Sequence, residues 1–462
     1  MFMTRWWRFV QSSLPPEVIN LIKLLKEHGF TGYLVGGAPR DLLLSKVPKD
    51  WDLATDALPE TVEEICMEHD QEETKVIQVG KKFGTIKLLR NGLVIEVTTF
   101  RREGPYSDGR HPDWVEFRPG IEEDLSRRDF TVNAMALDVL GNQLIDPFGG
   151  RRDLKQKVIR AVGDPEQRFA EDALRMLRFF RFQSGLGFRG DRTTERAINP
   201  YLVKQISPER IREELTKLLV SPRPERGLLG LIRTGLLLSV APEFTSVVTD
   251  EHLTAHLLKT VETIKPHPHL RWAALLHDLG KTQCRTVDEN GPHYYGHAEV
   301  GEELAHGLLE RLRFSKDFIK RVTILVRWHM FSADPGQTDA ALRRLALKVG
   351  EENLGGLLEL RRADIIASGQ NYHRAWEGFS AFASRVEALL QKEKVLTLQD
   401  LAVNGEDIMK TLGIPAGPQV GVVLQDLFAW VTEEPDRNNE KDLYCYLEEH
   451  YQTANRQINS KD

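Results

Sequence analysis

The stretch Tyr33-Leu34-Val35-Gly36-Gly37, followed by Asp50-Trp51-Asp52-Leu53-Ala54-Thr55, decides the fold that we predict for the N-terminal part of the chain. The first run is apolar and strand-like, and the two glycines that end it let backbone amides approach a ligand closely. The second run predicts another strand, whose alternating side chains put Asp50 and Asp52 on one side. Two neighbouring carboxylates repel each other unless a cation binds them, and oxygen ligands beside a phosphate site favour Mg²⁺. We therefore expect a magnesium site here. Two solvated acids on an exposed strand edge are the simpler alternative.

A third acid, Glu96, stands in a β-rich run that follows a predicted hairpin turn. Residues 83–89 and 93–100 are joined through Asn91-Gly92, and Asn-Gly between such runs is a strong hairpin signal. As a neighbour of Asp50 and Asp52, Glu96 would complete a carboxylate triad able to bind two metal ions and take a hydroxyl proton. An acid on an edge strand is an equally good interpretation.

Composition indicates a folded chain with several domains and no membrane segment. It has 462 residues, of which 41% are hydrophobic and 28% charged, and this length predicts roughly three domains. The widely separated Cys66, Cys284 and Cys445 predict reduced thiols in a cytoplasmic protein. The aromatic segment 1–16 is too short to span a membrane, and we expect a surface extension. The net charge of −6 does not exclude a local basic face.

Strand patterns fade near residue 150, and helical periodicity follows. Residues 101–119 predict a mobile charged loop, and residues 126–136 predict a helix whose first turn meets anionic groups. Residues 170–182 predict one helix with Asp172, Arg175 and Arg178 on a shared face. An intrahelical salt bridge on a solvated face is the alternative for these charges.

The chain resembles the class II tRNA nucleotidyltransferases, the bacterial CCA-adding enzymes of the polymerase-β-like superfamily that also includes bacterial poly(A) polymerases. The resemblance rests on motifs in family order: Val35-Gly36-Gly37 with Arg40-Asp41, Lys49-Asp50-Trp51-Asp52, Arg127-Arg128-Asp129-Phe130-Thr131-Val132-Asn133-Ala134, Glu171-Asp172-Ala173-Leu174-Arg175 with Arg178, and Ser207-Pro208-Glu209-Arg210-Ile211. A later histidine-rich block with His277-Asp278 resembles an HD phosphohydrolase domain.

This resemblance implies an α+β fold with a polymerase-β-like head, a small mixed or antiparallel sheet with helices, followed by all-α domains. The expected parts are a nucleotidyltransferase head (1–150), a neck with the base-binding helix (151–240), an HD domain (241–390) and a helical tRNA-binding tail (391–462). Glycines around Gly413 and Gly421 in the tail could contact phosphates, or could belong to a plain helix-turn-helix linker. The oligomeric state stays open.

The resemblance also implies a role for each motif residue. Asp50 and Asp52 would hold Mg²⁺, and Glu96 would lie nearest the attacking hydroxyl of the tRNA 3′ end. The nucleotide would be bound by Gly36, Gly37, Arg40, Arg127, Arg128, Asn133, Asp172, Arg175 and Arg178. In the HD block, a divalent metal would be held by His256, His277, Asp278 and Asp364, and a second one by His297 and His329.

Base choice follows from hydrogen-bond complementarity. Cytosine and adenine present an amino donor beside a ring-nitrogen acceptor, whereas uracil and guanine present a carbonyl beside a ring N–H. A carboxylate at Asp172 and a guanidinium at Arg175 therefore suit C and A. We expect CTP and ATP as substrates, selected by the protein without a nucleic-acid template.

Four alternatives stay open beside full CCA addition. A poly(A) polymerase would share the catalytic motifs, although residues 79–86 look more like the tRNA enzymes. The charged loop at 101–119 resembles an element associated with switching to ATP and argues against CC-only addition, while A-only addition stays open. An HD phosphohydrolase acting on nucleotides or RNA ends is the fourth, and the intact Asp50 and Asp52 disfavour it as the main activity.

Overall fold

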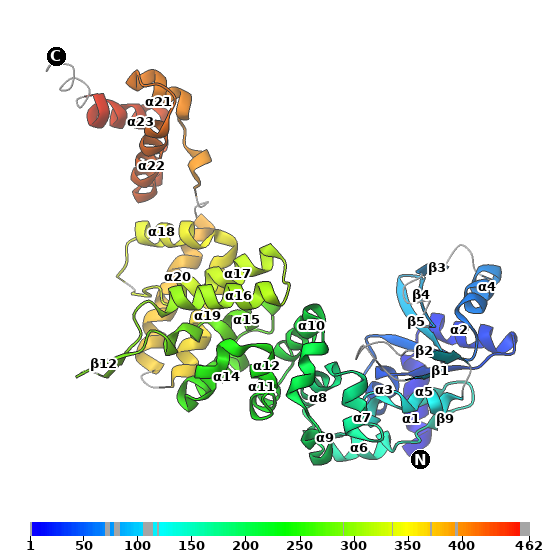
Figure 1. Cartoon of the computed structure of the whole chain (residues 1–462). Helices are drawn as coiled ribbons and strands as arrows, with labels where there is room; N and C mark the ends of the chain where they lie inside the picture. Colours follow the sequence, from blue (N-terminus) through cyan, green and yellow to red (C-terminus); the bar gives the residue numbers. More distant parts are fainter. Residues whose placement is uncertain are drawn as a thin grey trace. The chain divides into compact units, whose positions relative to one another are not determined.

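The computed structural model describes residues 2–69, 74–77, 84–104, 114–117, 120–289, 291–334, 336–369, 372–392 and 396–452. Its contacts divide the chain into two compact units, Met1–Thr245 and Ser246–Asp462. The first unit combines a sheet with helices and the second is almost entirely helical, so the predicted mixed α+β class is confirmed (Figure 1). None of the described helices is long and apolar enough to cross a membrane.

A seven-stranded sheet forms the centre of the head. Its strands, in the order in which they lie side by side, are β3 (Thr74–Ile77), β4 (Thr85–Arg90), β5 (Leu93–Thr99), β2 (Trp51–Thr55), β1 (Gly32–Val35), β8 (Ala136–Asp138) and β9 (Gln143–Ile145). Only β2 and β5 pair in parallel, and every other neighbouring pair is antiparallel. The sheet is therefore mixed, as predicted.

The hairpin of β4 and β5 forms where the Asn-Gly signal predicted it. Asn91 and Gly92 both have positive φ angles, 47° and 78°, which two-residue hairpin turns of the I′ type require. Strict alternation then buries Ile86 and Leu88 of β4, with Ile95 and Val97 of β5, on one face of the sheet. The opposite face is left for the polar side chains at Lys87 and Glu96.

Four of the described helices contribute buried residues to the core on the apolar face: α1 (Phe2–Ser13), α2 (Pro16–Glu27), α3 (Gly37–Leu43) and α4 (Pro59–His69) (Figure 1). The expectation that residues 1–16 form a surface extension is wrong. Trp6, Val10 and Leu14 recur every four residues and are buried, so α1 packs its apolar stripe into the head core. The Trp6 indole N–H donates to the Leu42 carbonyl at 3.1 Å, at the end of α3 (Gly37–Leu43).

The neck contains α6 (Gly150–Gln156), α7 (Pro165–Glu171), α8 (Leu174–Leu186), α9 (Arg192–Arg196), α10 (Pro208–Leu219), α11 (Pro224–Arg233) and α12 (Leu236–Val240). The prediction of one helix over 170–182 is wrong, because α7 ends at Glu171 and a separate helix, α8, begins at Leu174. Asp172 is extended there (φ −147°, ψ 101°), and its Oδ1 accepts a hydrogen bond from the Leu174 amide at 3.1 Å. A short polar side chain that accepts from the backbone N–H two residues later favours such a break.

The second unit begins with a helical body. Its helices are α14 (Glu251–Thr263), α15 (Pro268–Leu276), α16 (His297–Arg311), α17 (Lys316–Trp328), α18 (Asp339–Val349), α19 (Glu351–Ser368) and α20 (Tyr372–Lys392). A small exposed hairpin, β12 (Thr286–Asp288) with β13 (Gly291–His293), separates α15 from α16. In Figure 1, α14 to α17 and α19 lie side by side in this body.

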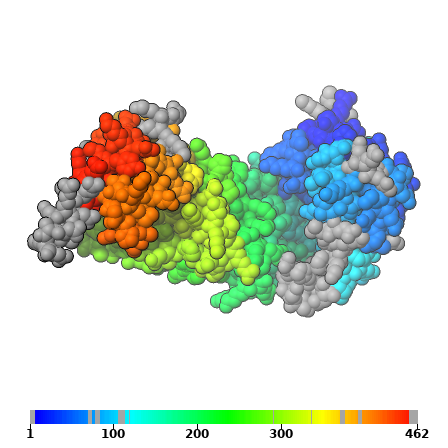
Figure 2. All heavy atoms as spheres, turned by 90° about the horizontal axis from the view of Figure 1, so that it is seen from above, coloured from blue at the N-terminus to red at the C-terminus, as the bar shows by residue number. Residues whose placement is uncertain are grey.

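Three further helices, α21 (Gly405–Leu412), α22 (Pro418–Glu433) and α23 (Glu440–Leu447), gather around an apolar core of their own (Figure 2, orange to red). Gly413 has φ 66° and ends α21, while Gly417 directly precedes α22. The glycine-rich segment is thus the turn between two helices.

Candidate active site and metal centre

The carboxylates of the head meet on the polar face of the sheet. Asp52 pairs in register with Val35 on β1 and with Glu96 on β5. Because paired residues point to the same face, the side chains of Asp52 and Glu96 are neighbours. Burial and the charges of Glu96 and Asp50 together raise the pKa of Asp52 to about 6, against the opposing effect of Arg128. The three acids predicted from the sequence therefore form one repelling group.

Glu96 does not lie on an edge strand, because β4 and β2 flank β5 on both sides. The edge-strand alternative for this acid is wrong. Its carboxylate contacts the Lys87 ammonium at 3.1 Å, from the paired position on β4. Both side chains are partly exposed, so the pair holds Glu96 only weakly and leaves it open to a ligand.

Gly36 lets a carboxylate and a guanidinium approach the backbone. Its φ is +70°, and a Cβ there would lie 2.8 Å from Asp52 Oδ2 and 3.5 Å from Arg128 Nη1. Any side chain at this position would displace the Asp52 carboxylate. Gly37 begins α3, which also carries Arg40.

Two arginines of the predicted nucleotide site are held by acids that the sequence interpretation missed. The buried Asp124, on α5 (Ile121–Ser126), accepts from Arg127 Nη2 at 2.8 Å and from Arg128 Nη2 at 3.2 Å. Burial alone would raise the pKa of Asp124, but Arg127 and Arg128 lower it below its usual value. Glu103 accepts from Arg101 Nε at 2.7 Å and from Arg127 Nη1 at 3.2 Å.

The helix expected over 126–136 is wrong, because α5 ends at Ser126 and only a 3₁₀ turn, Thr131–Asn133, follows. Arg127 and Arg128 thus follow the helix rather than begin one. The i,i+3 and i,i+4 spacing of Asp124 to Arg127 and Arg128 was the signal that would have revealed their partner.

A second chain of polar contacts links Arg40 to the neck. Arg40 Nη1 donates to Asn133 Oδ1 at 2.8 Å, and Asn133 Nδ2 donates to Asp129 Oδ1 at 3.2 Å. Asp129 Oδ2 accepts from Arg178 at 2.8 and 2.7 Å, a forked contact. Burial alone would raise the pKa of Asp129, but the guanidinium of Arg178 and the Asn133 amide hold it at about 2. Arg178 also contacts Glu214 of α10 at 3.4 Å.

The expected base-reading pair lies at the junction of α7 and α8. Asp172 Oδ2 accepts from Arg210 Nη2 at 2.7 Å, so the Ser-Pro-Glu-Arg motif at 207–210 supplies its partner. Arg175 donates to Glu171 Oε2 at 2.7 Å and to the Arg127 carbonyl at 2.8 Å. The expected alternative, an intrahelical salt bridge among Asp172, Arg175 and Arg178 on a solvated face, is wrong, because Asp172 pairs with Arg210 of α10 and the largely buried Arg175 pairs with Glu171 of α7. Figure 1 places α7, α8 and α10 in neighbouring positions.

An open cavity of about 520 Å³ adjoins this junction. It is lined by residues of α5, α7 and the strand β6 (Arg101–Glu103), and its walls include Arg127, Arg168 and Glu171. Most of the predicted mobile loop, residues 105–113 and 118–119, lies outside the described residues, as do 79–83.

In the second unit, all six residues predicted for the histidine block come together. His256 lies on α14, His277 and Asp278 at the end of α15, His297 at the start of α16, His329 at the end of α17, and Asp364 on α19. In one group, His256 Nε2 lies 3.3 Å from Asp278 Oδ2 and 3.2 Å from Asp364 Oδ1, and His277 Nε2 lies 3.3 Å from Asp278 Oδ2.

The other group uses the second oxygen of the same aspartate. His297 Nε2 and His329 Nε2 each lie 3.4 Å from Asp278 Oδ1, and 3.2 Å from each other. Asp278 Oδ1 is buried and has no hydrogen-bond partner of good geometry among the described residues. A carboxylate that points each oxygen at a separate group of imidazoles is arranged to bridge two cations.

Backbone contacts orient three of these imidazoles. The Nδ1 atoms of His277, His297 and His329 donate to the carbonyls of Ala274, Tyr294 and Val326 at 2.9, 2.7 and 2.6 Å. Each neutral ring therefore presents the lone pair of Nε2 to the centre, as in metal sites with ordered outer ligands. Burial alone would lower the pKa of His256, but Asp278 and Asp364 raise it to about 9. A proton on His256 thus offsets the negative charges of Asp278 and Asp364, which a bound metal ion would otherwise offset.

A polar cavity of about 630 Å³ opens beside the first group. Its walls carry His256 together with Lys281, Arg285 and Tyr294. Lys281 Nζ contacts Asp278 Oδ2 at 2.5 Å. Asp250 and Glu251 also line the cavity, and of its charged groups Lys281 and Arg285 are those that suit an anionic ligand.

Comparison with known proteins finds three matching family models. A poly A polymerase head domain matches residues 32–160, a probable RNA- and SrmB-binding site of polymerase A matches 187–247, and a putative tRNA nucleotidyltransferase domain 2 matches 296–445. These regions do not include residues 248–295, which carry His256, His277 and Asp278.

Two curated relatives and two solved structures illustrate the similarity. The chain is 36% identical to a CCA-adding enzyme of Geobacillus stearothermophilus, over 95% of this chain and 98% of the relative. It is 46% identical to a CCA-adding enzyme of Lactobacillus helveticus, over 48% of this chain and 54% of the relative. A Bacillus stearothermophilus CCA-adding enzyme in complex with CTP superposes with a TM-score of 0.75 and 32% identity, covering 96% of this chain and all of that one. The Thermotoga maritima enzyme complexed with tRNA shares the fold, with a TM-score of 0.58 at 22% identity over 95% and 97% of the two chains.

Proposed function

The chain belongs to the CCA-adding enzymes, and from this membership we propose which of its residues build or repair the 3′-terminal CCA of tRNA. It is a tRNA nucleotidyltransferase, and its substrates are CTP, ATP and the tRNA 3′ end. The observation that carries the proposal is the register of Asp52 with Glu96 beneath Gly36, because it joins three separate motifs in one site.

Nucleotidyltransferases of this family use a divalent metal, and we propose Mg²⁺ held by Asp50 and Asp52. The donor set fits, because burial and the charges of Glu96 and Asp50 raise the pKa of Asp52, and a bound cation would relieve this repulsion. Bound there, such ions would stabilise the attacking and leaving oxygens. Glu96 lies on the neighbouring strand, where it would accept the proton of the tRNA 3′ hydroxyl.

The triphosphate would lie between the Gly36-Gly37 backbone and the arginines of the head. Arg128 is within reach of both Gly36 and Asp52, and Asp124 holds it together with Arg127. A buried acid that fixes two guanidiniums before binding reduces the entropy lost when the phosphates bind.

Base selection is assigned to Asp172 and Arg175. Arg210 fixes the Asp172 carboxylate, and Glu171 with the Arg127 carbonyl fixes the Arg175 guanidinium. Oriented in this way, an acceptor and a donor match the hydrogen-bonding edges of cytosine and adenine and mismatch those of uracil and guanine. Arg127 thereby connects the triphosphate arginines with the base-reading junction.

The direct test uses three tRNAs that end before the CCA, after the first C and after CC. Each is incubated with Mg²⁺ and every NTP singly, and with CTP plus ATP, and products are resolved to one nucleotide. Full CCA addition requires C on the shortest tRNA and one A on the longest. A failure to add C would identify an A-adding enzyme, a stop after CC would identify a CC-adding one, and long A tracts would identify a poly(A) polymerase.

Two variants test the residue assignments in the same assay. Asp52→Ala should lower addition of both nucleotides by at least about a thousandfold, since metal catalysis contributes several kcal/mol. Asp172→Ala should lower discrimination against UTP by about tenfold to a hundredfold, as expected for one lost base contact. Unchanged C and A addition by the first variant, or unchanged base selectivity in the second, would refute the assigned role. Glu122→Gln, an exposed carboxylate on α5, serves as the control.

A second activity is supported by the six-residue group around Asp278. We propose an HD-type metal centre with two divalent ions, one held by His256, His277, Asp278 and Asp364, and one by Asp278, His297 and His329. When bound, such ions would activate water for attack on a phosphate ester. Lys281 and Arg285 in the adjoining cavity would bind the anionic group.

Metal analysis of purified protein tests this centre, followed by hydrolysis assays with p-nitrophenyl phosphate and its bis ester. Asp278→Asn should remove both ions and any hydrolysis while CCA addition continues. Full metal content in Asp278→Asn would refute the bridging arrangement. Metal without hydrolysis of either ester would identify a structural centre.

Two remaining assignments concern RNA contacts and location. Lys and Arg outnumber Asp and Glu over 151–240, whereas acids outnumber bases over 391–462. We therefore propose that the neck supplies the electrostatic contact with tRNA, and that the tail would use backbone amides near Gly413. A cytoplasmic location fits the tRNA substrate and the buried thiol of Cys66.

A further inference from the structure

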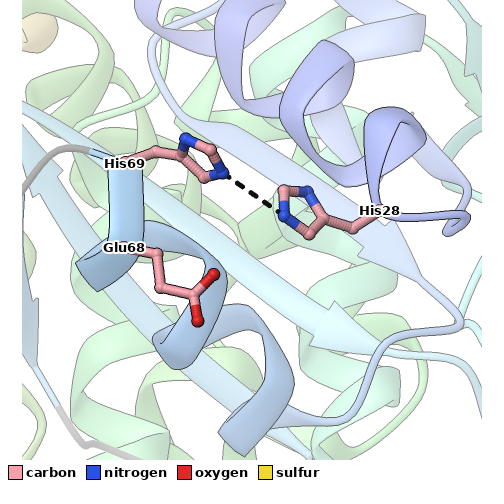
Figure 3. A group of neighbouring side chains, drawn as sticks. All are labelled: His28, Glu68 and His69. Atoms are coloured by element: carbon pink, nitrogen blue, oxygen red, sulfur yellow. Dashed lines mark hydrogen bonds between the residues drawn. The ribbon is translucent and has the colours of Figure 1, made fainter.

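Away from both sites, two histidines and a glutamate meet at the surface of the head. His28 directly follows α2, and Glu68 and His69 end α4 (Figure 3). The two imidazoles face each other with 3.3 Å between their Nε2 atoms, and one candidate ligand atom from each of the three side chains lies within 4.8 Å of the others. Neither the motifs nor the proposed reactions use these residues.

Backbone contacts prepare His28 to be a ligand. Its Nδ1 donates to the Leu24 carbonyl at 2.9 Å, four residues earlier on α2. The neutral ring therefore presents the lone pair of Nε2 to His69. The rings are inclined at 72°, with centroids 5.0 Å apart, so they meet edge to edge rather than stacking. A hydrogen bond between the two Nε2 atoms holds this arrangement when one of them carries a proton.

The spacing of the nitrogens matches the edge of a metal tetrahedron. Two imidazole nitrogens that each lie at about 2.05 Å from a tetrahedral Zn²⁺ are separated by about 3.3 Å. Zinc accepts imidazole nitrogen and carboxylate oxygen together, whereas Mg²⁺ demands oxygen ligands. The exposure of His69 and Glu68 leaves room for a water molecule as the fourth ligand.

We propose that His28, His69 and Glu68 bind one zinc ion, or a transition metal of similar ligand preference, at the surface of the head. Binding requires a lone pair on both Nε2 atoms, so the Nε2 proton of His69 moves to its Nδ1 as the ion binds. It joins the C-terminal ends of α2 and α4, two helices that cover the same face of the sheet. Because residues 28–31 connect α2 to β1, the ion stabilises the strand that ends at Val35, directly before Gly36.

The test is zinc titration of the full chain, compared among single variants. The cluster around Asp278 also takes zinc, so the number of bound ions is compared with the wild type rather than read alone. His28→Gln and His69→Gln should each lose one zinc equivalent at micromolar zinc, with CCA addition retained. The control is His450→Gln, whose Nδ1 has the same contact with the carbonyl four residues earlier but which belongs to no group of candidate ligands in the described residues.

Two further measurements separate zinc binding from misfolding. Zinc should raise the unfolding temperature of the wild-type head, and this increase should disappear in His28→Gln while the metal-free variant unfolds like the metal-free wild type. With Cu²⁺ substituted, electron paramagnetic resonance should lose a two-nitrogen signal in either histidine variant. Equal zinc stoichiometry in the wild type and both variants, or a loss that also appears in His450→Gln, would overturn the proposal.

Discussion

Replacing Asp52 with asparagine should stabilise the metal-free head while removing its nucleotidyl transfer. In the fold, burial and the charges of Glu96 and Asp50 raise the pKa of Asp52 from 3.8 to about 6. This difference corresponds to about 3 kcal/mol of unfavourable free energy for the ionised carboxylate, at 1.36 kcal/mol per pKa unit. The partial exposure of the side chain makes this figure an upper bound, because solvent screens part of the repulsion.

The size of the effect depends on pH. Because the folded pKa lies above the unfolded one, the folded state binds more protons between about pH 4 and pH 6, and its stability falls as the pH rises through that window. Below pH 4 the aspartic acid is neutral in both states. An asparagine resembles the neutral acid at every pH, so its advantage should approach 3 kcal/mol at pH 8 and vanish near pH 4.

Hydrogen exchange of the backbone amides of β1, β2 and β5 measures this difference locally, which is necessary in a chain with two compact units. The experiment compares Asp52→Asn with wild type in EDTA at both pH values. Adding Mg²⁺ should then stabilise the wild type and leave Asp52→Asn unchanged, since only a complete ligand set gains binding energy.

The matched control is Glu122→Gln, which removes an exposed carboxylate from α5 and should change stability by less than about 0.5 kcal/mol. Equal protection of Asp52→Asn and wild type at pH 8 in EDTA would refute the view that the three acids form a repelling group that awaits a cation.

Three other perturbations follow from single contacts. Gly36→Ala should lower nucleotide addition about a hundredfold with an intact fold, because its Cβ would lie 2.8 Å from Asp52 Oδ2 at a positive φ; a fully active variant by primer extension would contradict this. Asp129→Asn should destabilise the first unit by about 3 kcal/mol above pH 4, because Arg178 holds the pKa of Asp129 at about 2 against its burial. The variant should also lack the loss of stability that the wild type shows between pH 4 and pH 2. Urea unfolding at both pH values measures the free energy of unfolding, and an unchanged value in the variant would refute the pairing. Trp6→Phe should lose about 2 kcal/mol in thermal unfolding, because it removes the indole donor to the Leu42 carbonyl and leaves part of the buried indole volume unfilled. A loss within experimental error would contradict both contributions.

The sheet and its hairpin were predictable because the signals are local. Alternation over 86–97 and the Asn91-Gly92 turn require no knowledge of distant residues. The helix over 170–182 was mispredicted, since the i,i+3 charges continued a helical period while the Asp172 side chain accepts from the Leu174 amide and Asp172 itself is extended. The surface extension expected over 1–16 was wrong for a different reason: the apolar stripe of α1 is buried only because a distant sheet face is there to pack against it.

The supporting residues of the site could not be predicted from neighbouring positions. Glu103, Asp124 and Glu214 are acids of ordinary spacing that become important through arginines 3 to 36 residues away. Asp124 alone had a local signal. The assignments of Asp172 and Arg175 to base choice stay predictions, although Arg210 and the Arg127 carbonyl explain how both side chains are held.

The sequence by itself determined the reaction class, because the acids, glycines and arginines that bind a metal and a triphosphate occur in short motifs whose residue types and spacing carry the chemistry. The tertiary structure alone decided which groups share a ligand. Only folding puts Glu96 beside Asp52, gives the two oxygens of Asp278 to different histidine pairs, and brings His28 to 3.3 Å from His69. These contacts join residues from different strands and helices, and the energy that positions them comes from burying the apolar faces of those elements, which no single motif contains.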